Sequence, residues 1–293
     1  MTTVLVYGGT GAQGGAVVRE LRLQGFEVRA VTRDARKARA LESLGATVFS
    51  GDLAERATLE AASRGIDRLM LLLPVGFDKA RGVLMGRNAI DAAIQGGASL
   101  AVYNASGPIP YEDSGSATAD IKREVAAYLL ASGIASIVLQ PTIYLDNFAQ
   151  AWAAPALVRG SLEYPIPSSF KVAWISWRDN AAYCAAALSH PELAGRSFLI
   201  GGAEELTGPQ LAERFARKLG REIRFASTDL GQFESAINGL LGPPCGTELG
   251  VWYRWVARQK TSPYAGVDAG ELGVRPQSVD SWIAAHDWSR EGS

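Results

Sequence analysis

The sequence predicts an α/β protein whose main domain is a doubly wound parallel sheet. Six short apolar runs alternate with five helix-like stretches over the first 141 residues. One of these runs, DRLMLLL, is nearly all apolar after its first residues, which is typical of a central strand buried on both faces. The links between the runs are short, and this favours helices that cover both faces of one sheet.

Turn and breaker residues mark the ends of the predicted elements. Gly45 and Gly133 follow helix-like stretches as C-caps, Gly96 and Gly97 end the longest helix, and Pro141 closes the sixth strand. The predicted strands are residues 4–7, 28–31, 47–50, 67–73, 99–104 and 135–140, and the predicted helices are residues 16–24, 35–44, 55–64, 79–95 and 119–132.

The alternation stops after Pro141. Thr207 is a predicted N-cap. Apolar patterns predict helices at 147–158, 178–188, 208–219, 231–241, 248–257 and 278–285, and extended segments at 162–167, 173–177, 197–200 and 222–225. We interpret residues 1–141 as the sheet domain, to which 172–202 return, and 142–293 mainly as a smaller α+β lobe. A ligand crevice is expected between this lobe and the sheet edge.

The turn after the first strand carries the clearest functional signal. The run VLVYGGTGAQGG places a glycine-rich turn between a strand and a helix. Gly9, Gly11 and Gly14 fit G-x-G-x-x-G, and Gly8, Gly11 and Gly14 fit the looser G-x-x-G-x-x-G. In either frame the pyrophosphate of a dinucleotide can approach bare backbone at a helix N-terminus, as in the Rossmann fold. The alternative is a glycine-rich turn in some other βα unit.

The residues after the second strand predict which dinucleotide binds. Arg33 lies at the strand tip, where an arginine accommodates a 2′-phosphate, so we predict NADP(H) in preference to NAD(H). Lys37 either helps Arg33 to bind the 2′-phosphate or is a solvated helix charge. Asp34 keeps open a dual specificity for NADP(H) and NAD(H). Asp52 and Leu53 follow the third strand, where the carboxylate either contacts adenine or caps a helix. Leu73 and Pro74 are expected to wall the ribose and nicotinamide.

The composition bounds the other possibilities. With 29 basic and 30 acidic residues and a net charge of -1, no basic excess is present to bind nucleic acid. No apolar run is long enough to span a bilayer, and no secretory signal is recognisable, so no membrane partner is expected. Two cysteines, Cys184 and Cys245, favour a reduced cytoplasmic setting. His190 and His286 are the only histidines, and no metal site is expected.

Three segments carry a family resemblance. The glycine turn with VFSGDL, the stretch DIKREVAAYLLASGIASIVLQPTIYLDNF, and ISWRDNAAYCAAALSHPELAGRSFLIGG resemble the NmrA-like family of atypical short-chain dehydrogenases/reductases. The resemblance implies a Rossmann domain with a C-terminal substrate lobe that binds NADP(H). The cofactor contacts that it implies are Gly8, Thr10, Gly11, Ala12, Gln13, Gly14, Arg33 and Asp52. It also places Lys122 on the family lysine and Tyr144 and Asn147 near the nicotinamide.

One departure from the wider superfamily affects the chemistry. The usual Tyr-x-x-x-Lys pair is missing, because position 118 is Thr118. We therefore predict that Lys122 is the catalytic cation, or holds the nicotinamide ribose, and that Tyr144 is a hydroxyl donor unless it is a core tyrosine. Ser106 ends the fifth strand, where it is either a cofactor contact or a turn serine. The predicted substrate contacts are Phe77, Tyr144, Phe148 and Trp152, with Trp174 and residues 252–255 as weaker candidates.

The resemblance implies at least two functional classes of family members. Some reduce quinones or related carbonyl compounds, and others bind the dinucleotide as a signal and regulate a partner protein. We predict an NADPH-dependent reductase of a small quinone or aromatic carbonyl compound. The alternative is an NADP(H)-binding redox sensor with a regulatory protein partner. A homodimer is possible in both cases.

Overall fold

The computed structural model describes residues 1–288, and its centre is a seven-stranded sheet in the order β3-β2-β1-β4-β5-β6-β8. All neighbouring strands pair in parallel. The order reverses between β1 and β4, which is the switch point where such sheets bind ligands. The strands are β1 (Thr3–Tyr7), β2 (Glu27–Thr32), β3 (Thr47–Ser50), β4 (Arg68–Leu72), β5 (Leu100–Asn104), β6 (Ala135–Pro141) and β8 (Ser197–Ile200).

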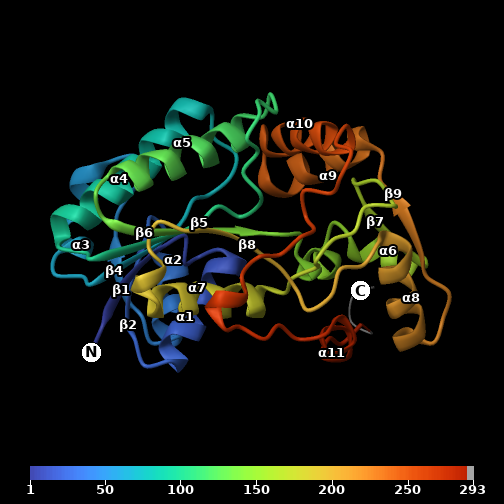
Figure 1. The fold of residues 1–293 in the computed structure, drawn as a ribbon, viewed down its shortest axis with the longest axis horizontal. Coiled ribbons are helices and arrows are strands. Elements are labelled where there is room, and N and C mark those ends of the chain that lie inside the picture. The colour runs from blue at the N-terminus through green and yellow to red at the C-terminus, as the bar shows by residue number, and fades with distance from the viewer. Residues whose placement is uncertain (289–293) are drawn as a thin grey trace.

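Helices cover both faces of the sheet, so the predicted doubly wound α/β class is confirmed (Figure 1). One face carries α1 (Ala12–Leu23), α2 (Ala35–Ser43) and α7 (Trp177–Ser189). The other carries α3 (Glu60–Ser63), α4 (Lys79–Gly96) and α5 (Ala117–Ala131).

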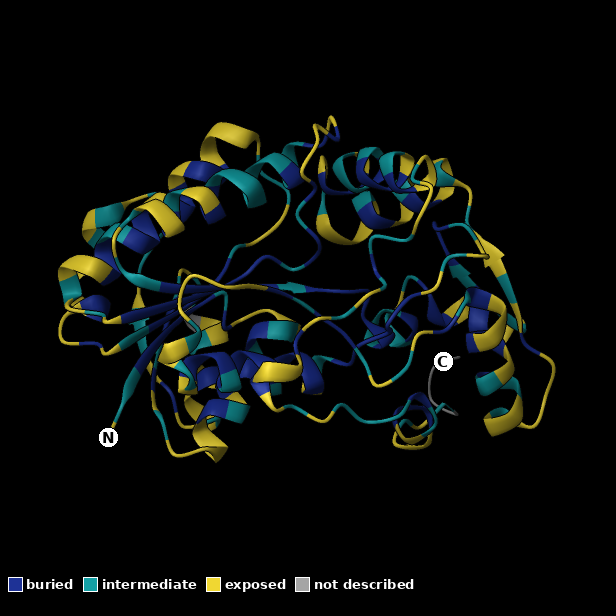
Figure 2. Ribbon diagram, viewed as in Figure 1, coloured by how far each residue is buried: buried dark blue, intermediate teal, exposed yellow. Residues whose placement is uncertain are grey.

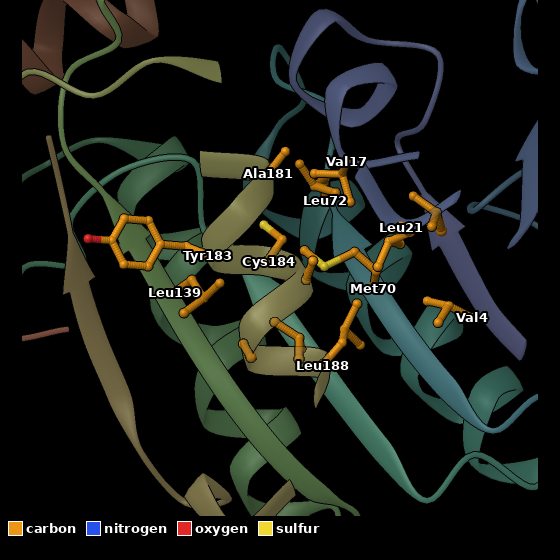
Figure 3. Packing of buried hydrophobic residues seen from close by; sticks show 14 of the residues in the cluster. Val4, Val17, Leu21, Met70, Leu72, Leu139, Ala181, Tyr183, Cys184 and Leu188 are labelled. Atoms are coloured by element: carbon orange, nitrogen blue, oxygen red, sulfur yellow. The ribbon is translucent and has the colours of Figure 1, made fainter. Parts of the chain in front are cut away.

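The strands alternate their side chains between the two cores. In β1, Val4 and Val6 pack toward α1, whereas Leu5 and Tyr7 pack toward α4 and α5. Because both faces are buried, the central strands have no polar face, which is why they read as unbroken apolar runs (Figure 2). Figure 3 shows α7 contributing Cys184 and Leu188 to the first core, beside Met70 of β4.

The remaining elements build a second layer beyond the carboxyl ends of the strands. They are β7 (Ser161–Tyr164), which pairs in parallel with β9 (Arg224–Ser227), and α6 (Ala154–Val158), α8 (Gly208–Leu219), α9 (Leu230–Leu241), α10 (Cys245–Ala257) and α11 (Val279–Ala284). They share a third, aromatic-rich core. The helix α8 begins as expected at Thr207, whose side chain forms a capping box with Gln210.

Three predicted elements are wrong or incomplete. The helix expected over 147–158 is a 3₁₀ turn, Leu145–Ala149, followed by the short α6. Pro155 lies in the first turn of α6, where its missing N–H costs nothing, but it would interrupt a longer helix. The strand expected at 173–177 makes only one isolated bridge, between Ile175 and Tyr144, because its backbone bonds go to different segments. The helix expected over 55–64 is a 3₁₀ turn, Arg56–Leu59, that continues into α3.

None of the helices in residues 1–288 is both long and apolar enough to pass through a bilayer.

Candidate active site

The glycine turn is held together by backbone contacts that leave no room for side chains. Gly8 has φ +80°, and a Cβ there would lie 2.6 Å from the carbonyl oxygen of Leu72. A Cβ on Gly14 would lie only 2.1 Å from the carbonyl oxygen of Gly8. A Cβ on Gly9 would meet nothing closer than a side-chain methyl of Val18, at 3.3 Å. The structure therefore favours the looser frame, which begins at Gly8.

The start of α1 is open to an anion. Its N-cap is Gly11, which offers no side-chain hydrogen bond, and its first turn has no acidic residue. Thr10, Gly11 and Ala12 are exposed. At Gly11 an added Cβ would find only the Gly8 carbonyl oxygen within 4 Å, at 3.5 Å. The free N–H groups and the unfilled space at Gly11 fit a dinucleotide diphosphate.

A cavity of about 150 Å³ lies beside this turn, at the carboxyl ends of β1 and β2. Its lining includes the predicted residues Gly8, Thr10, Arg33, Lys37, Asp52, Leu53 and Pro74. The Nη1 of Arg33 lies 3.5 Å from Oδ2 of Asp52, and the Arg33 side chain is 59% exposed. The other carboxylate oxygen of Asp52 accepts from the N–H of Ala54, so Asp52 closes a turn rather than a helix. The contact with Asp52 thus holds the Arg33 guanidinium beside the cavity, while the guanidinium remains accessible to a ligand.

Asp34 is occupied by local structure. Its Oδ1 accepts from the backbone N–H of Arg36 at 2.9 Å and so caps α2. The Arg36 guanidinium pairs with the same carboxylate, and this pairing lowers the pKa of Asp34. The Arg36 side chain is itself almost fully exposed. Asp34 is therefore less available to a ribose hydroxyl than its place after β2 suggests.

A larger cavity of about 240 Å³ lies between the sheet edge and the second layer. Its lining includes the predicted residues Gln13, Ser106, Lys122, Tyr144, Asn147 and Trp152. A third cavity, of about 70 Å³, shares Pro74 with the first and Ser106 and Lys122 with the second, and it is also lined by Leu73. The three cavities therefore form a row along the carboxyl ends of the strands, which is where a long dinucleotide is expected to lie.

Gln13 connects the glycine turn to the larger cavity. Its Oε1 accepts from the hydroxyl of Tyr144 at 3.0 Å and from Oγ of Ser106 at 3.2 Å. Ser106 has φ +52°, a strained value for a residue other than glycine, and its N–H donates to the buried Asn104 side chain. The loop after β5 is thus held in a conformation that turns the Ser106 hydroxyl toward α1.

Lys122 is the only charged residue that lines the larger cavity, among the residues that the structure describes. Its Nζ lies 3.5 Å from the carbonyl oxygen of Ser106 and 5.7 Å from the ring centroid of Trp252. A Cβ on Gly107 would lie 2.6 Å from Nζ, so the glycine at this position leaves space for the ammonium. Burial lowers the pKa of Lys122 to about 8.

Three tyrosines on the far wall share one hydrogen-bond chain. The Nδ2 of Asn147 donates to the Tyr164 hydroxyl at 3.0 Å, which lies 2.9 Å from the Tyr253 hydroxyl. The indole N–H of Trp252 donates to the Tyr264 hydroxyl at 2.7 Å, and the Tyr264 and Tyr253 hydroxyls are also bonded. The hydroxyls at the two ends of this chain, Tyr164 and Tyr264, each accept from an N–H group. Two of the three phenol protons therefore make the two hydroxyl–hydroxyl bonds, and the third is left to donate to a ligand.

Of these phenols, only Tyr253 lies in a stretch that the sequence singled out, the weaker candidate 252–255, and Tyr164 and Tyr264 were not predicted. They come from β7, α10 and the segment after it, and no spacing in the chain links them. Burial raises the pKa of all three, that of Tyr164 to about 12, so they stay protonated at neutral pH. These tyrosines therefore present a hydrogen-bond donor, and not a negative charge, to the cavity.

Two predicted substrate residues lie outside this cavity. Phe148 is 1% exposed and packs against Tyr164, Trp174 and Phe215 in the third core. Phe77 lies under the guanidinium of Arg81. The weaker candidate Trp174 is buried in the same core as Phe148. Aromatic rings at helical spacing formed core packing here, because Leu145–Ala149 turns inward.

Within residues 1–288 no group of three or more His, Cys, Asp or Glu side chains is arranged to hold a metal ion.

The chain is similar to known proteins of one family. A model of the NmrA-like family matches residues 1–283. The NAD(P)H azoreductase of Xenophilus azovorans is 32% identical over 238 residues, which are 81% of each chain. Quinone oxidoreductase 2 of Escherichia coli (strain K12) is 25% identical over 239 residues, 81% of this chain and 82% of that one. NmrA, a negative transcriptional regulator solved in complex with NADP, has a TM-score of 0.75 at 17% identity, with 98% of both chains covered. The chain belongs to the NmrA-like family, as the resemblance in its glycine turn and in residues 120–148 predicts.

Proposed function

We propose that the protein is an NADPH-dependent oxidoreductase that transfers a hydride to a small quinone or carbonyl acceptor. The observation that carries this proposal is the placement of Lys122. It is a cation with no carboxylate partner among residues 1–288, and it lies in an aromatic cavity that Gln13 joins to the glycine turn. The names of two relatives, an azoreductase and a quinone oxidoreductase, support a reductase.

The row of cavities suggests how the cofactor is held. The diphosphate would bind the free amides at Ala12 and Gln13, with Arg33 and Lys37 at the adenosine end. Leu73, Pro74, Ser106, Lys122 and Asn147 would surround the nicotinamide. In this proposal residues 1–141 with 172–202 bind the cofactor, and most of 142–293 binds the acceptor.

A bound reduced nicotinamide supplies a hydride, and a quinone becomes a hydroquinone when it takes up this hydride and one further proton. The residues of the chain stabilise and position the acceptor. The Lys122 ammonium lies where negative charge on an acceptor oxygen can be neutralised. The phenol O–H that is left over in the tyrosine chain can donate a hydrogen bond to a second oxygen of the acceptor. Tyr144 donates to Gln13 and so aligns the wall between the two sites.

Arg33→Ala is expected to weaken NADPH binding by about tenfold to 100-fold and to leave NADH binding within about twofold. The guanidinium has an accessible fork beside the adenosine cavity, whereas Asp34 is engaged by α2. Titration of both cofactors by calorimetry measures the difference. Arg39→Ala is the matched control, since Arg39 is an exposed arginine of α2 that does not line that cavity. Equal losses for both cofactors with Arg33→Ala would refute the contact with the 2′-phosphate.

NADPH oxidation in the presence of a panel of small quinones, azo dyes and aldehydes tests the activity. We expect turnover with quinones, followed by loss of the nicotinamide absorbance. NADPH binding without turnover on any acceptor would contradict the proposed reaction.

That second outcome would favour a regulator that binds NADP(H) without turnover. One observation supports this alternative. Position 118 lines the cavity with a threonine, so the tyrosine that normally supplies the proton in the superfamily is missing there.

A further inference from the structure

The larger cavity opens to solvent through an apolar rim. Leu240 and Leu241 at the end of α9 line the cavity and are 51% and 52% exposed. Val75, in the loop after β4, also lines the cavity and is 44% exposed. The buried Ile237 and the half-buried Leu249 continue this surface inward. We call these five residues the apolar rim.

The elements that carry the rim are in direct contact. A Cβ on Gly76 would lie 2.2 Å from Sγ of Cys245, so the loop after β4 touches the start of α10. Figure 1 shows α9 and α10 together beyond the carboxyl ends of the strands. The opening is therefore bounded by elements that pack against each other.

The rim is unusual for an exposed surface of this protein. Ten large apolar side chains are exposed in residues 1–288, and three of them lie at this one opening. No carboxylate lines the cavity in the described part of the chain, and its one cation, Lys122, lies beside Ser106 at the inner end. The lining thus changes from polar donors inside to aliphatic carbon outside.

This gradient of polarity favours a ligand whose reacting end is polar and whose outer end is apolar. From it we infer that the acceptor carries an uncharged apolar substituent, which leaves the cavity across Leu240, Leu241 and Val75 while the reacting ring lies against Lys122. A charged substituent would meet no counter-ion at the rim, and a bare ring would leave the leucines in water. The inference rests on the proposed function and defines its substrate class more narrowly.

A series of para-benzoquinones with straight alkyl chains of increasing length tests it. With the unmodified protein, kcat/KM should rise by up to about fourfold for each methylene that the rim covers, and should then level off. In the Leu240→Ser/Leu241→Ser double variant the dependence on chain length should become nearly flat. The control is Leu130→Ser, an equally exposed leucine on α5 that lines none of the three cavities, and it should keep the original dependence.

Binding of the same quinones to the protein saturated with NADP⁺, followed by tryptophan fluorescence, separates this inference from the proposed reaction. Trp152 and Trp252 line the cavity and report on a bound quinone. Affinity that rises with chain length supports the inference even if no quinone is reduced. Chain-length independence in both kinetics and binding overturns it and leaves the reductase activity standing. A dimer that the serine double variant dissociates, with no chain-length effect, would assign the rim to a second copy and would also overturn it.

Discussion

Gly14→Ala is expected to remove cofactor binding and to destabilise the whole sheet domain. The new Cβ would lie 2.1 Å from a carbonyl oxygen and 2.8 Å from the Cα of Gly9, both backbone atoms. Neither can move without displacing β1 or α1, so we expect a loss of roughly 3 kcal/mol or more in the free energy of unfolding. NADPH affinity should fall at least about 100-fold. Thermal unfolding and calorimetry with NADPH measure the two effects.

Two neighbouring glycines separate the fold from the ligand. A Cβ on Gly15 would have its nearest contact at 3.7 Å, so Gly15→Ala should bind NADPH normally and be at least as stable as the parent. A Cβ on Gly11 is tolerated by the protein itself, with its nearest contact at 3.5 Å, but would project toward the expected diphosphate. Gly11→Ala should therefore keep its melting temperature and lose about tenfold or more in affinity. Unchanged affinity would place the diphosphate elsewhere.

Lys122→Met is expected to lower kcat by about 100-fold while NADPH binding changes much less. The ammonium is the only charge in the cavity, among the described residues, that can neutralise a developing oxyanion. Because the pKa of Lys122 is about 8, kcat/KM of the unmodified protein should fall as the pH rises through that value. The variant should show no such fall. Lys171→Met, an exposed lysine outside the cavities, is the control. A rate unchanged by Lys122→Met would remove this residue from the mechanism.

The same lysine is expected to reduce stability. Burial disfavours its charged form and moves its pKa from 10.5 to about 8. Between these values the unfolded chain binds more protons than the folded one, so the stability of the unmodified protein rises with pH in that window. Below pH 8 the destabilisation is present in full, and Lys122→Met should raise the free energy of unfolding at pH 7 by about 2 kcal/mol. A loss of activity together with a gain in stability would distinguish a functional lysine from a structural one.

Local patterns were enough to predict the sheet. The apolar runs predicted β1 to β6 and β8 closely, because a strand buried on both faces must be apolar along its whole length. The prediction of one helix over 147–158 was wrong, because apolar spacing alone does not show that Leu145–Ala149 turns Phe148 into the third core. The prediction of a strand at 173–177 was wrong, because strand-like residues form a strand only if a neighbouring strand pairs with them through a continuous ladder of hydrogen bonds.

The sequence by itself determined the parallel sheet, the glycine turn and the family, because each depends on residues that are close together in the chain. Only the tertiary structure decided which side chains meet in the larger cavity. Gln13 and Tyr144 lie 131 positions apart, and Tyr164 and Tyr253 lie 89 apart, yet each pair shares a hydrogen bond. Such contacts depend on how the second layer packs on the sheet edge, and this packing is a sum of many weak long-range interactions that no local pattern records.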